Sequence, residues 1–228
     1  MSAEEVLAGL VGLIVLIFSV VVHENAHGIT AERFGDPTAR YSGRITLNPL
    51  PHIDPIGSII VPLIAILGKI PPIGWARPVP VNPANLRNPG VHNAYVAAAG
   101  PMSNLLLAIA AALLWILIRV FFKHVSLLEA TGGNTLLFFG ILCDSLIKIN
   151  CVLMVFNLIP IPPLDGHWIL MRFLPPSGKA VLAAIGPYGF FILIILLWTG
   201  VLGMIISLPL RFLYYNLRLF VEIVVNAL

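Results

Sequence analysis

Long apolar stretches, separated by short polar segments, run through the whole chain. The first occupies residues 6–34, contains a polar cluster at residues 23–27, and ends as a helix at Gly35 and Pro37. Further apolar stretches of helical length follow at residues 92–122, 135–157, 180–198 and 204–228. A bilayer core of about 30 Å needs about 20 such residues. The pattern therefore predicts an all-α polytopic membrane protein with about four to six membrane helices.

Two segments between the first and second apolar stretches do not fit a full crossing. Residues 40–47 alternate between polar and apolar side chains, which predicts a short β-hairpin. Residues 57–68 are apolar, but as a helix they reach only about 18 Å, so we expect a re-entrant or interfacial segment. The last stretch, residues 204–228, carries polar side chains at helical spacing and either spans the membrane or lies in its interface.

The composition agrees with a chain surrounded by lipid. Of the 228 residues, 59% are hydrophobic and 10% are charged, whereas soluble domains average about 45–50% apolar and about 25% charged residues. This difference excludes a water-soluble globule. The formal net charge is +3, but the basic residues are scattered at the ends of apolar stretches, which argues against a nucleic-acid partner. We predict one domain over residues 1–228, with its core at about 5–175 and C-terminal helices at about 180–226.

The polar cluster in the first stretch reads His23-Glu24-Asn25-Ala26-His27. Two histidines four positions apart on a helix share one face and can bind one Zn²⁺, while the intervening glutamate can act as a general base. Ionisable residues inside a membrane helix are costly unless a partner compensates them. A bound metal explains the cluster better than a chance match on a solvated helix.

A catalytic zinc needs a third protein ligand, and Asp165 is the best candidate. Pro160, Pro162 and Pro163 interrupt the preceding helix because proline removes helical hydrogen bonds. Gly166 then lets the backbone turn so that the carboxylate faces the interior.

The other polar candidates have ordinary structural explanations. Asp144 lies four residues before Lys148 on one helix face, which predicts an ion pair. Asp36 and Asp54 lie in turn-like sequences, where aspartate is common. His167 follows the proline-rich turn, and we expect it to be an interfacial histidine with satisfied hydrogen bonds.

Three sequence elements resemble the site-2 protease family of intramembrane zinc metalloproteases. They are its His-Glu-x-x-His element at residues 23–27, its Gly-Pro-x-x-Asn element at 100–104 and its Asn-x-x-Pro-x-Pro-x-x-Asp-Gly element at 157–166. Residues 47–57 and 75–83 look like the compact bacterial branch, which has no appended PDZ or CBS domain. The resemblance covers about residues 20–174.

This resemblance implies a fold, a cofactor and an activity. The implied fold has a three-helix catalytic core, and the implied enzyme is a zinc metalloendopeptidase that hydrolyses peptide bonds of transmembrane protein substrates in regulated intramembrane proteolysis. The implied cofactor is one catalytic Zn²⁺. The implied residues are His23, His27 and Asp165 for the metal, Glu24 as the general base, and Asn104 and Asn157 for the substrate or oxyanion.

The positions of the two zinc elements predict the topology. Both lie at the C-terminal ends of their helices and must meet at one depth, so these helices run parallel and residues 92–122 cross back between them. Arg119 and Lys123 then lie at the end of the bundle opposite the zinc. The zinc side holds more basic residues, namely Arg33, Arg40, Arg44, Lys69, Arg77, Arg87, Arg172 and Lys179. By the positive-inside rule we expect a multi-pass protein of the cytoplasmic membrane, with its active site toward the cytoplasm and its N-terminus outside.

We expect zinc to activate a water molecule by lowering its pKa toward about 7, and Glu24 to take the proton. A transmembrane substrate must unwind before attack, because a helix keeps its carbonyls in hydrogen bonds, and an edge of the predicted hairpin would pair with it. Two alternatives stay open: a zinc-binding membrane protein or transporter that cleaves nothing, and a zinc enzyme that hydrolyses a lipid or small molecule. A homo-oligomer is also left open.

Overall fold

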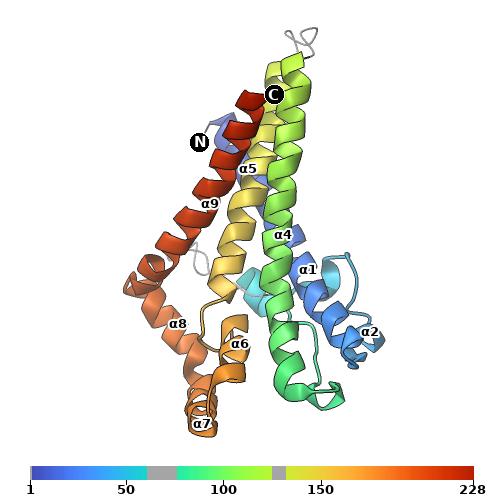
Figure 1. The fold of residues 1–228 in the computed structure, drawn as a ribbon, viewed down its shortest axis with the longest axis vertical. Coiled ribbons are helices and arrows are strands. Elements are labelled where there is room, and N and C mark those ends of the chain that lie inside the picture. Colours follow the sequence, from blue (N-terminus) through green and yellow to red (C-terminus); the bar gives the residue numbers. More distant parts are fainter. Residues whose placement is uncertain (1, 61–75, 125–131) are drawn as a thin grey trace.

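The structure, a computed structural model, describes residues 2–60, 76–124 and 132–228. Helices make up its regular structure (Figure 1). The longer ones are α1 (Ala3–Arg33), α4 (Pro89–His124), α5 (Gly132–Asn157), α6 (Asp165–Phe173), α7 (Pro176–Ile185), α8 (Gly189–Trp198) and α9 (Val201–Ala227). The short ones are α2 (Thr38–Tyr41), η1 (Leu50–His52), η2 (Pro55–Ile60), η3 (Pro83–Asn85) and η5 (Gly186–Tyr188).

Five stretches of the described residues are long and apolar enough to cross a membrane. They are Glu4–Arg33, Pro89–Lys123, Thr135–Asn157, Pro176–Trp198 and Val201–Ala227. Their outer faces expose large apolar side chains, among them Ile14, Leu106 and Phe191. Soluble monomers rarely expose contiguous apolar surface of this extent, which fits a lipid environment. The all-α, multi-pass prediction is confirmed.

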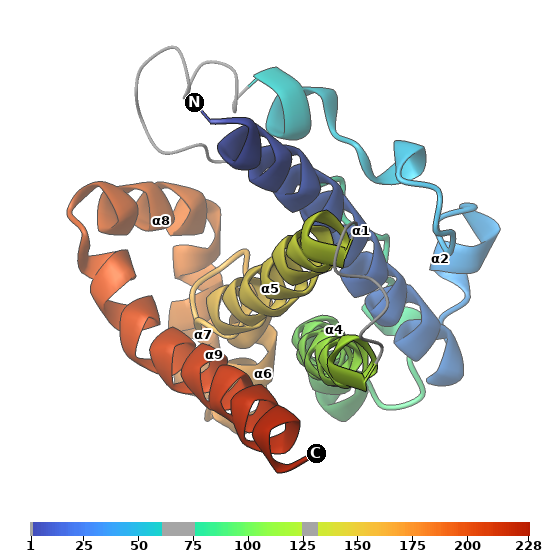
Figure 2. The ribbon, with the colours of Figure 1, turned by 90° about the horizontal axis from the view of Figure 1, so that it is seen from above.

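Helices α1, α4 and α5 pack against one another and form the centre of the bundle. Figure 1 shows α4 running opposite to α1 and α5, and Figure 2 shows the three side by side from above. The predicted parallel arrangement of the first and third helices is therefore confirmed. Helix α6 follows α5 at the end of the bundle where α1 also ends (Figure 1), and this brings the two zinc elements to one depth.

Small side chains allow α4 to pack closely against α5 and α9. Ala108, Ala111 and Ala112 are buried in a cluster with Cys151 of α5 and Val221 of α9. Within a membrane, lipid tails are as apolar as the side chains, so helices associate through close packing and polar contacts. The alanine face of α4 provides such packing.

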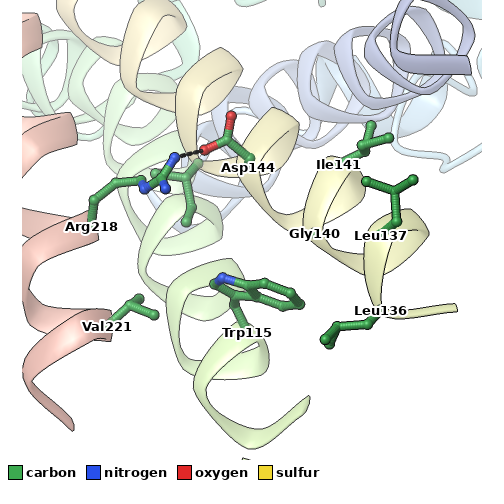
Figure 3. A pocket seen from close by; sticks show the side chains of 9 residues that line it. Trp115, Leu136, Leu137, Gly140, Ile141, Asp144, Arg218 and Val221 are labelled. Atoms are coloured by element: carbon green, nitrogen blue, oxygen red, sulfur yellow. Dashed lines mark hydrogen bonds and ion pairs between the residues drawn. The ribbon is translucent and has the colours of Figure 1, made fainter. Parts of the chain in front are cut away.

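The ion pair predicted for Asp144 exists, but the predicted partner was wrong. Arg218 Nη1 of α9 donates to Asp144 Oδ1 at 2.7 Å (Figure 3). The Tyr214 hydroxyl donates to the same oxygen at 2.7 Å. Lys148 is exposed instead. The spacing along α5 could not show that α9 packs on the face that carries the carboxylate.

A second ion pair joins α9 to the bundle. Arg119 Nη1 of α4 donates to Glu222 Oε1 at 2.6 Å. Together with the Arg218 pair, it directs the polar stripe of α9 toward α4 and α5, which favours a helix that spans rather than one that lies in the interface. A cavity of ≈ 460 Å³ lies between these three helices (Figure 3), and its lining residues include none of the predicted zinc ligands.

The β-hairpin predicted at residues 40–47 was wrong. The described residues contain no strand, and this segment begins within helix α2. Gly43, in the left-handed conformation with φ of 64°, follows the helical turn, and Arg40 pairs with Glu32 of α1. Over so few residues, the observed alternation is also compatible with a turn that packs one side on α1. The predicted pairing of a substrate with a hairpin edge is withdrawn with it.

The apolar segment predicted at residues 57–68 begins in η2 and otherwise lies outside the described residues. Asp54 caps η2, because its Oδ1 accepts the N–H groups of Ile56 at 3.0 Å and Gly57 at 2.7 Å. This capping agrees with the predicted turn role of Asp54.

Asp36 ties the end of α1 to residues that lie far along the chain. Its buried carboxylate accepts hydrogen bonds from the Asn82 N–H at 2.6 Å, Asn85 Nδ2 at 2.9 Å and the Thr38 N–H at 3.2 Å. Burial alone would raise the pKa of Asp36. The hydrogen bonds from Thr38, Asn85 and Asn82 together lower it by more, so the pKa lies below its ordinary value.

We predict that Asp36→Asn lowers the free energy of unfolding at pH 7 by roughly 2 kcal/mol, because hydrogen bonds to a charged group are lost. A depressed carboxyl pKa stabilises the fold fully above the unfolded value of about 4, and this contribution disappears as the pH falls through the lower folded value. The difference from wild type should therefore shrink near pH 3. Thermal unfolding in detergent, with the exposed Glu4→Gln as control, measures it. A pH-independent difference would contradict this origin.

Candidate metal centre

Three predicted ligands converge where α1 meets the start of α6. His23 Nε2 lies 3.2 Å from Asp165 Oδ2, and His27 Nε2 lies 3.4 Å from Asp165 Oδ1. One ligand atom from each of the three residues lies within 4.8 Å of the others. The two imidazole rings lie edge to face with centroids 4.7 Å apart, because successive turns of α1 place them on one face.

Local backbone structure brings Asp165 to this position. After α5 ends, the proline-rich turn is closed by the Leu164 N–H, which donates to the Ile161 carbonyl at 3.0 Å. Helix α6 then starts at Asp165 itself. A Cβ on the following Gly166 would lie 2.2 Å from the Leu158 carbonyl oxygen, so only glycine allows α6 to begin this close to the turn.

The donor atoms fit a divalent cation. His27 Nδ1 lies 2.7 Å from the Val96 carbonyl oxygen, which only accepts, so the proton of the neutral ring is on Nδ1 and Nε2 presents a lone pair to Asp165. Asp165 Oδ2 is buried and has no hydrogen-bond partner. Facing acceptor atoms repel unless a cation lies between them. Two imidazole nitrogens and a carboxylate are a ligand set typical of catalytic zinc, which keeps a fourth position open.

Helix α4 leaves room for such an ion. A Cβ on Gly100 would lie 2.5 Å from His23 Nε2 and 2.5 Å from His27 Nε2. Glycine at this point of the Gly-Pro-x-x-Asn element therefore keeps the third wall of the site free of side-chain atoms.

Glu24 is held by an extended segment that sequence reasoning did not connect with it. The Val79 N–H donates to Glu24 Oε2 at 2.7 Å. The buried Arg44 fixes this segment, because its Nη2 donates to the carbonyl oxygens of Arg77 at 2.6 Å and Pro78 at 3.2 Å. Each of these contacts joins a side chain to a backbone group more than thirty residues away in the sequence. No local pattern in the sequence signals them.

Comparison with known proteins finds relatives that share most of this chain. The chain is 40% identical over 187 residues to "Putative zinc metalloprotease YwhC" of Bacillus subtilis. These aligned residues cover 82% of this chain and 80% of that protein. It is 34% identical over 199 residues to "Putative zinc metalloprotease Rip2" of Mycolicibacterium smegmatis, which covers 85% of this chain and 70% of the relative. The chain belongs to the site-2 protease family. No family model and no solved structure matches it.

Rip2 of Mycobacterium tuberculosis is 31% identical over 181 residues, covering 79% of this chain and 63% of the relative. The printed names of these relatives support a metalloprotease and imply zinc as its metal. His23, His27 and Asp165, which the sequence predicts as ligands and the structure brings together, are where such an ion would be held.

The two asparagines that the resemblance names differ in their contacts. Asn104 is fully buried, and its Oδ1 contacts His23 Nδ1 at 2.6 Å. Asn157 is half-buried at the end of α5 and donates through Nδ2 to the Leu153 carbonyl oxygen at 2.9 Å. A role of Asn157 toward substrate stays a prediction.

His167 lies buried one turn into α6. Its Nδ1 contacts the Leu164 carbonyl oxygen, and its ring lies against Trp168 with centroids 4.5 Å apart. Burial lowers the pKa of His167, and the contact with Leu164 opposes this effect in part. These contacts agree with the predicted histidine whose hydrogen bonds are satisfied within the protein.

Proposed function

We propose that this protein is an intramembrane zinc metalloprotease that hydrolyses peptide bonds of transmembrane protein substrates. The observation that carries the proposal is the convergence of His23, His27 and Asp165 at a junction of apolar, lipid-exposed helices, with Glu24 between the two histidines in sequence. A transporter site needs ligands but gains nothing from a base placed between them.

Zinc bound by these three residues would lower the pKa of a water molecule and polarise a peptide carbonyl. Glu24 takes the proton from the water and passes it to the leaving amine as general base and then acid. The Val79 N–H on Oε2 fixes the orientation of this carboxylate, so we assign the proton transfers to Oε1. Helical substrates must unwind at the scissile bond, because their carbonyls are otherwise hydrogen-bonded.

We also propose that the zinc end of the bundle faces the cytoplasm and that the N-terminus lies outside the cell membrane. The support is the distribution of basic residues. The ends of α1 and α6, helices α2 and α7, and the connecting segments on the zinc side hold Arg33, Arg40, Arg44, Arg77, Arg87, Arg172 and Lys179. Arg119 and Lys123 lie near the other end of α4. Lys69 lies outside the described residues. Positively charged flanks favour the cytoplasmic side.

Asp165 and Asp144, two acids of the bundle that lie in different surroundings, provide the test of the metal site. We predict that the wild type binds about one zinc per chain and cleaves single-span peptides in detergent or vesicles. Asp165→Ala should weaken zinc binding by about 100-fold or more and abolish cleavage, because it removes one of three ligands. Asp144→Ala is the matched control, since its carboxylate pairs with Arg218 and should leave zinc binding unchanged.

Zinc content is measured by metal analysis after dialysis, and affinity is measured by chelator competition. Removal of zinc by a chelator should stop cleavage, and added zinc should restore it. Zinc loss in Asp144→Ala but not in Asp165→Ala would overturn the assignment. Stoichiometric zinc with hydrolysis of lipids or small esters in place of peptides would favour the other enzyme class, and zinc without any hydrolysis would favour a binding protein.

A further inference from the structure

A chain of buried polar side chains links His23 to the interior of α5. Asn104 Oδ1 lies 2.6 Å from His23 Nδ1, and Asn104 Nδ2 donates to Asn150 Oδ1 at 2.8 Å. Asn150 Nδ2 donates in turn to Ser19 Oγ at 2.9 Å. Ser19, Asn104 and Asn150 come from α1, α4 and α5, and none of them is exposed. Such a network in a membrane protein is costly unless every side chain in it has a hydrogen-bond partner. Each of these side chains has one.

Backbone carbonyls set the direction of the bonds in this chain, and the Leu146 carbonyl makes the shorter contact. Asn150 Nδ2 lies 2.9 Å from the Leu146 carbonyl oxygen, and since a carbonyl only accepts, this end of the amide is the NH₂ group. Asn150 Oδ1 therefore faces Asn104, which must present its own NH₂ group to it. Asn104 Nδ2 also lies 3.4 Å from the Ser19 carbonyl oxygen, which agrees with that orientation.

The orientation of Asn104 determines which nitrogen of His23 carries the proton. Because Asn104 Oδ1 faces His23 Nδ1, that nitrogen is the donor and Nε2 keeps its lone pair, 3.2 Å from Asp165 Oδ2. A reversed Asn104 amide would present its NH₂ group to Nδ1 and place the proton on Nε2. A protonated Nε2 cannot bind a metal.

We propose that Asn150 and Ser19 are positioning residues for the metal site. Asn150 fixes the Asn104 amide so that His23 presents Nε2 to zinc, and Ser19 anchors Asn150. This inference rests on the proposed zinc site. It also gives Asn104 a role behind the ligand, in place of contact with substrate. His27 needs no comparable relay, since a backbone carbonyl already orients its ring.

The test measures zinc affinity by chelator competition on the full chain in detergent. Asn150→Leu keeps the side-chain size but removes the nearer of the two acceptors of Asn104 Nδ2, at 2.8 Å against 3.4 Å for the Ser19 carbonyl oxygen. The Asn104 amide is then held less firmly, so we expect zinc affinity to fall about 10- to 100-fold. Ser19→Ala should have a smaller effect, about two- to fivefold, because the Leu146 carbonyl still orients Asn150. Cys151→Ala, at a fully buried neighbouring position of α5, is the matched control and should bind zinc like the wild type.

A second measurement separates positioning from general stability. In an Asn104→Ala background, Asn150→Leu should cause no further loss of zinc affinity, because its effect passes through Asn104. The visible spectrum of the Co²⁺-substituted protein should change in Ser19→Ala and in Asn150→Leu but not in Cys151→Ala, which keeps the test valid even if the leucine variant folds poorly. Wild-type zinc affinity in Asn150→Leu would overturn the inference. So would a loss of zinc affinity on adding Asn150→Leu to Asn104→Ala that equals the loss which Asn150→Leu causes alone. Failure of the wild type to bind zinc would instead overturn the proposed function.

Discussion

Gly100→Ala is expected to abolish zinc binding and, with it, proteolysis. The new Cβ would lie 2.5 Å from the Nε2 atoms of both His23 and His27, well inside van der Waals contact. The rings cannot move away freely, because Nδ1 of His23 is held by Asn104 and Nδ1 of His27 by the Val96 carbonyl. We expect zinc affinity to fall by at least about 100-fold, a loss comparable to removal of supporting groups around a ligand.

Gly12→Ala on α1 is the matched control for this prediction. A Cβ at Gly12 would meet no atom within 4 Å, so this variant should bind zinc and cleave peptides like the wild type. Chelator competition and peptide cleavage are measured on both variants, together with thermal unfolding of the metal-free forms. If Gly100→Ala kept wild-type zinc affinity, the site would have to lie elsewhere or α4 would have to move away from it.

Glu24→Gln should retain zinc and lose most of its activity. Glutamine has the same size, and its carbonyl oxygen can still accept the Val79 N–H, so the metal site and its surroundings should persist. It cannot take a proton from water, and loss of a general base costs about 10²- to 10⁴-fold in rate. The expected result is a lower kcat at unchanged zinc content, measured by single-turnover cleavage and metal analysis.

Glu32→Gln provides the comparison on the same helix. Glu32 pairs with Arg40 outside the metal centre, so its substitution should leave kcat unchanged. Equal cleavage rates in Glu24→Gln and wild type would refute the proposed mechanism and would leave zinc binding without base catalysis. A loss of zinc in Glu24→Gln would mean that the glutamate contributes to the site itself.

Local patterns in the sequence were sufficient for the helices and for the paired histidines. Apolar length alone predicts the membrane helices, and the four-residue spacing of His23 and His27 places both rings on one face of α1. Asp165 could be predicted as the third ligand because prolines and a glycine mark the turn that places its side chain. The parallel course of α1 and α5 followed from requiring these elements to meet.

Contacts between distant segments could not be predicted in this way. The choice of Arg218 over Lys148 as partner of Asp144 depends on where α9 packs, which spacing within α5 does not encode. The hydrogen bond from Val79 to Glu24 uses a backbone N–H, so the side chain at that position carries no signal of it. The alternation at residues 40–47 was compatible with both strand and turn, and packing against α1 decided between them.

The two ends of the chain lie at the same end of the bundle, away from α6 (Figure 1). Helices α7 and α8 stay in the half that holds α6, and α9 continues to the far end (Figure 1). About 20 residues of α1 separate its start from His23, a distance of about 30 Å along the helix. A fluorescent or affinity fusion on either terminus would therefore lie at the end of the bundle opposite His23, His27 and Asp165, and reporters on both termini would lie close to one another at that end.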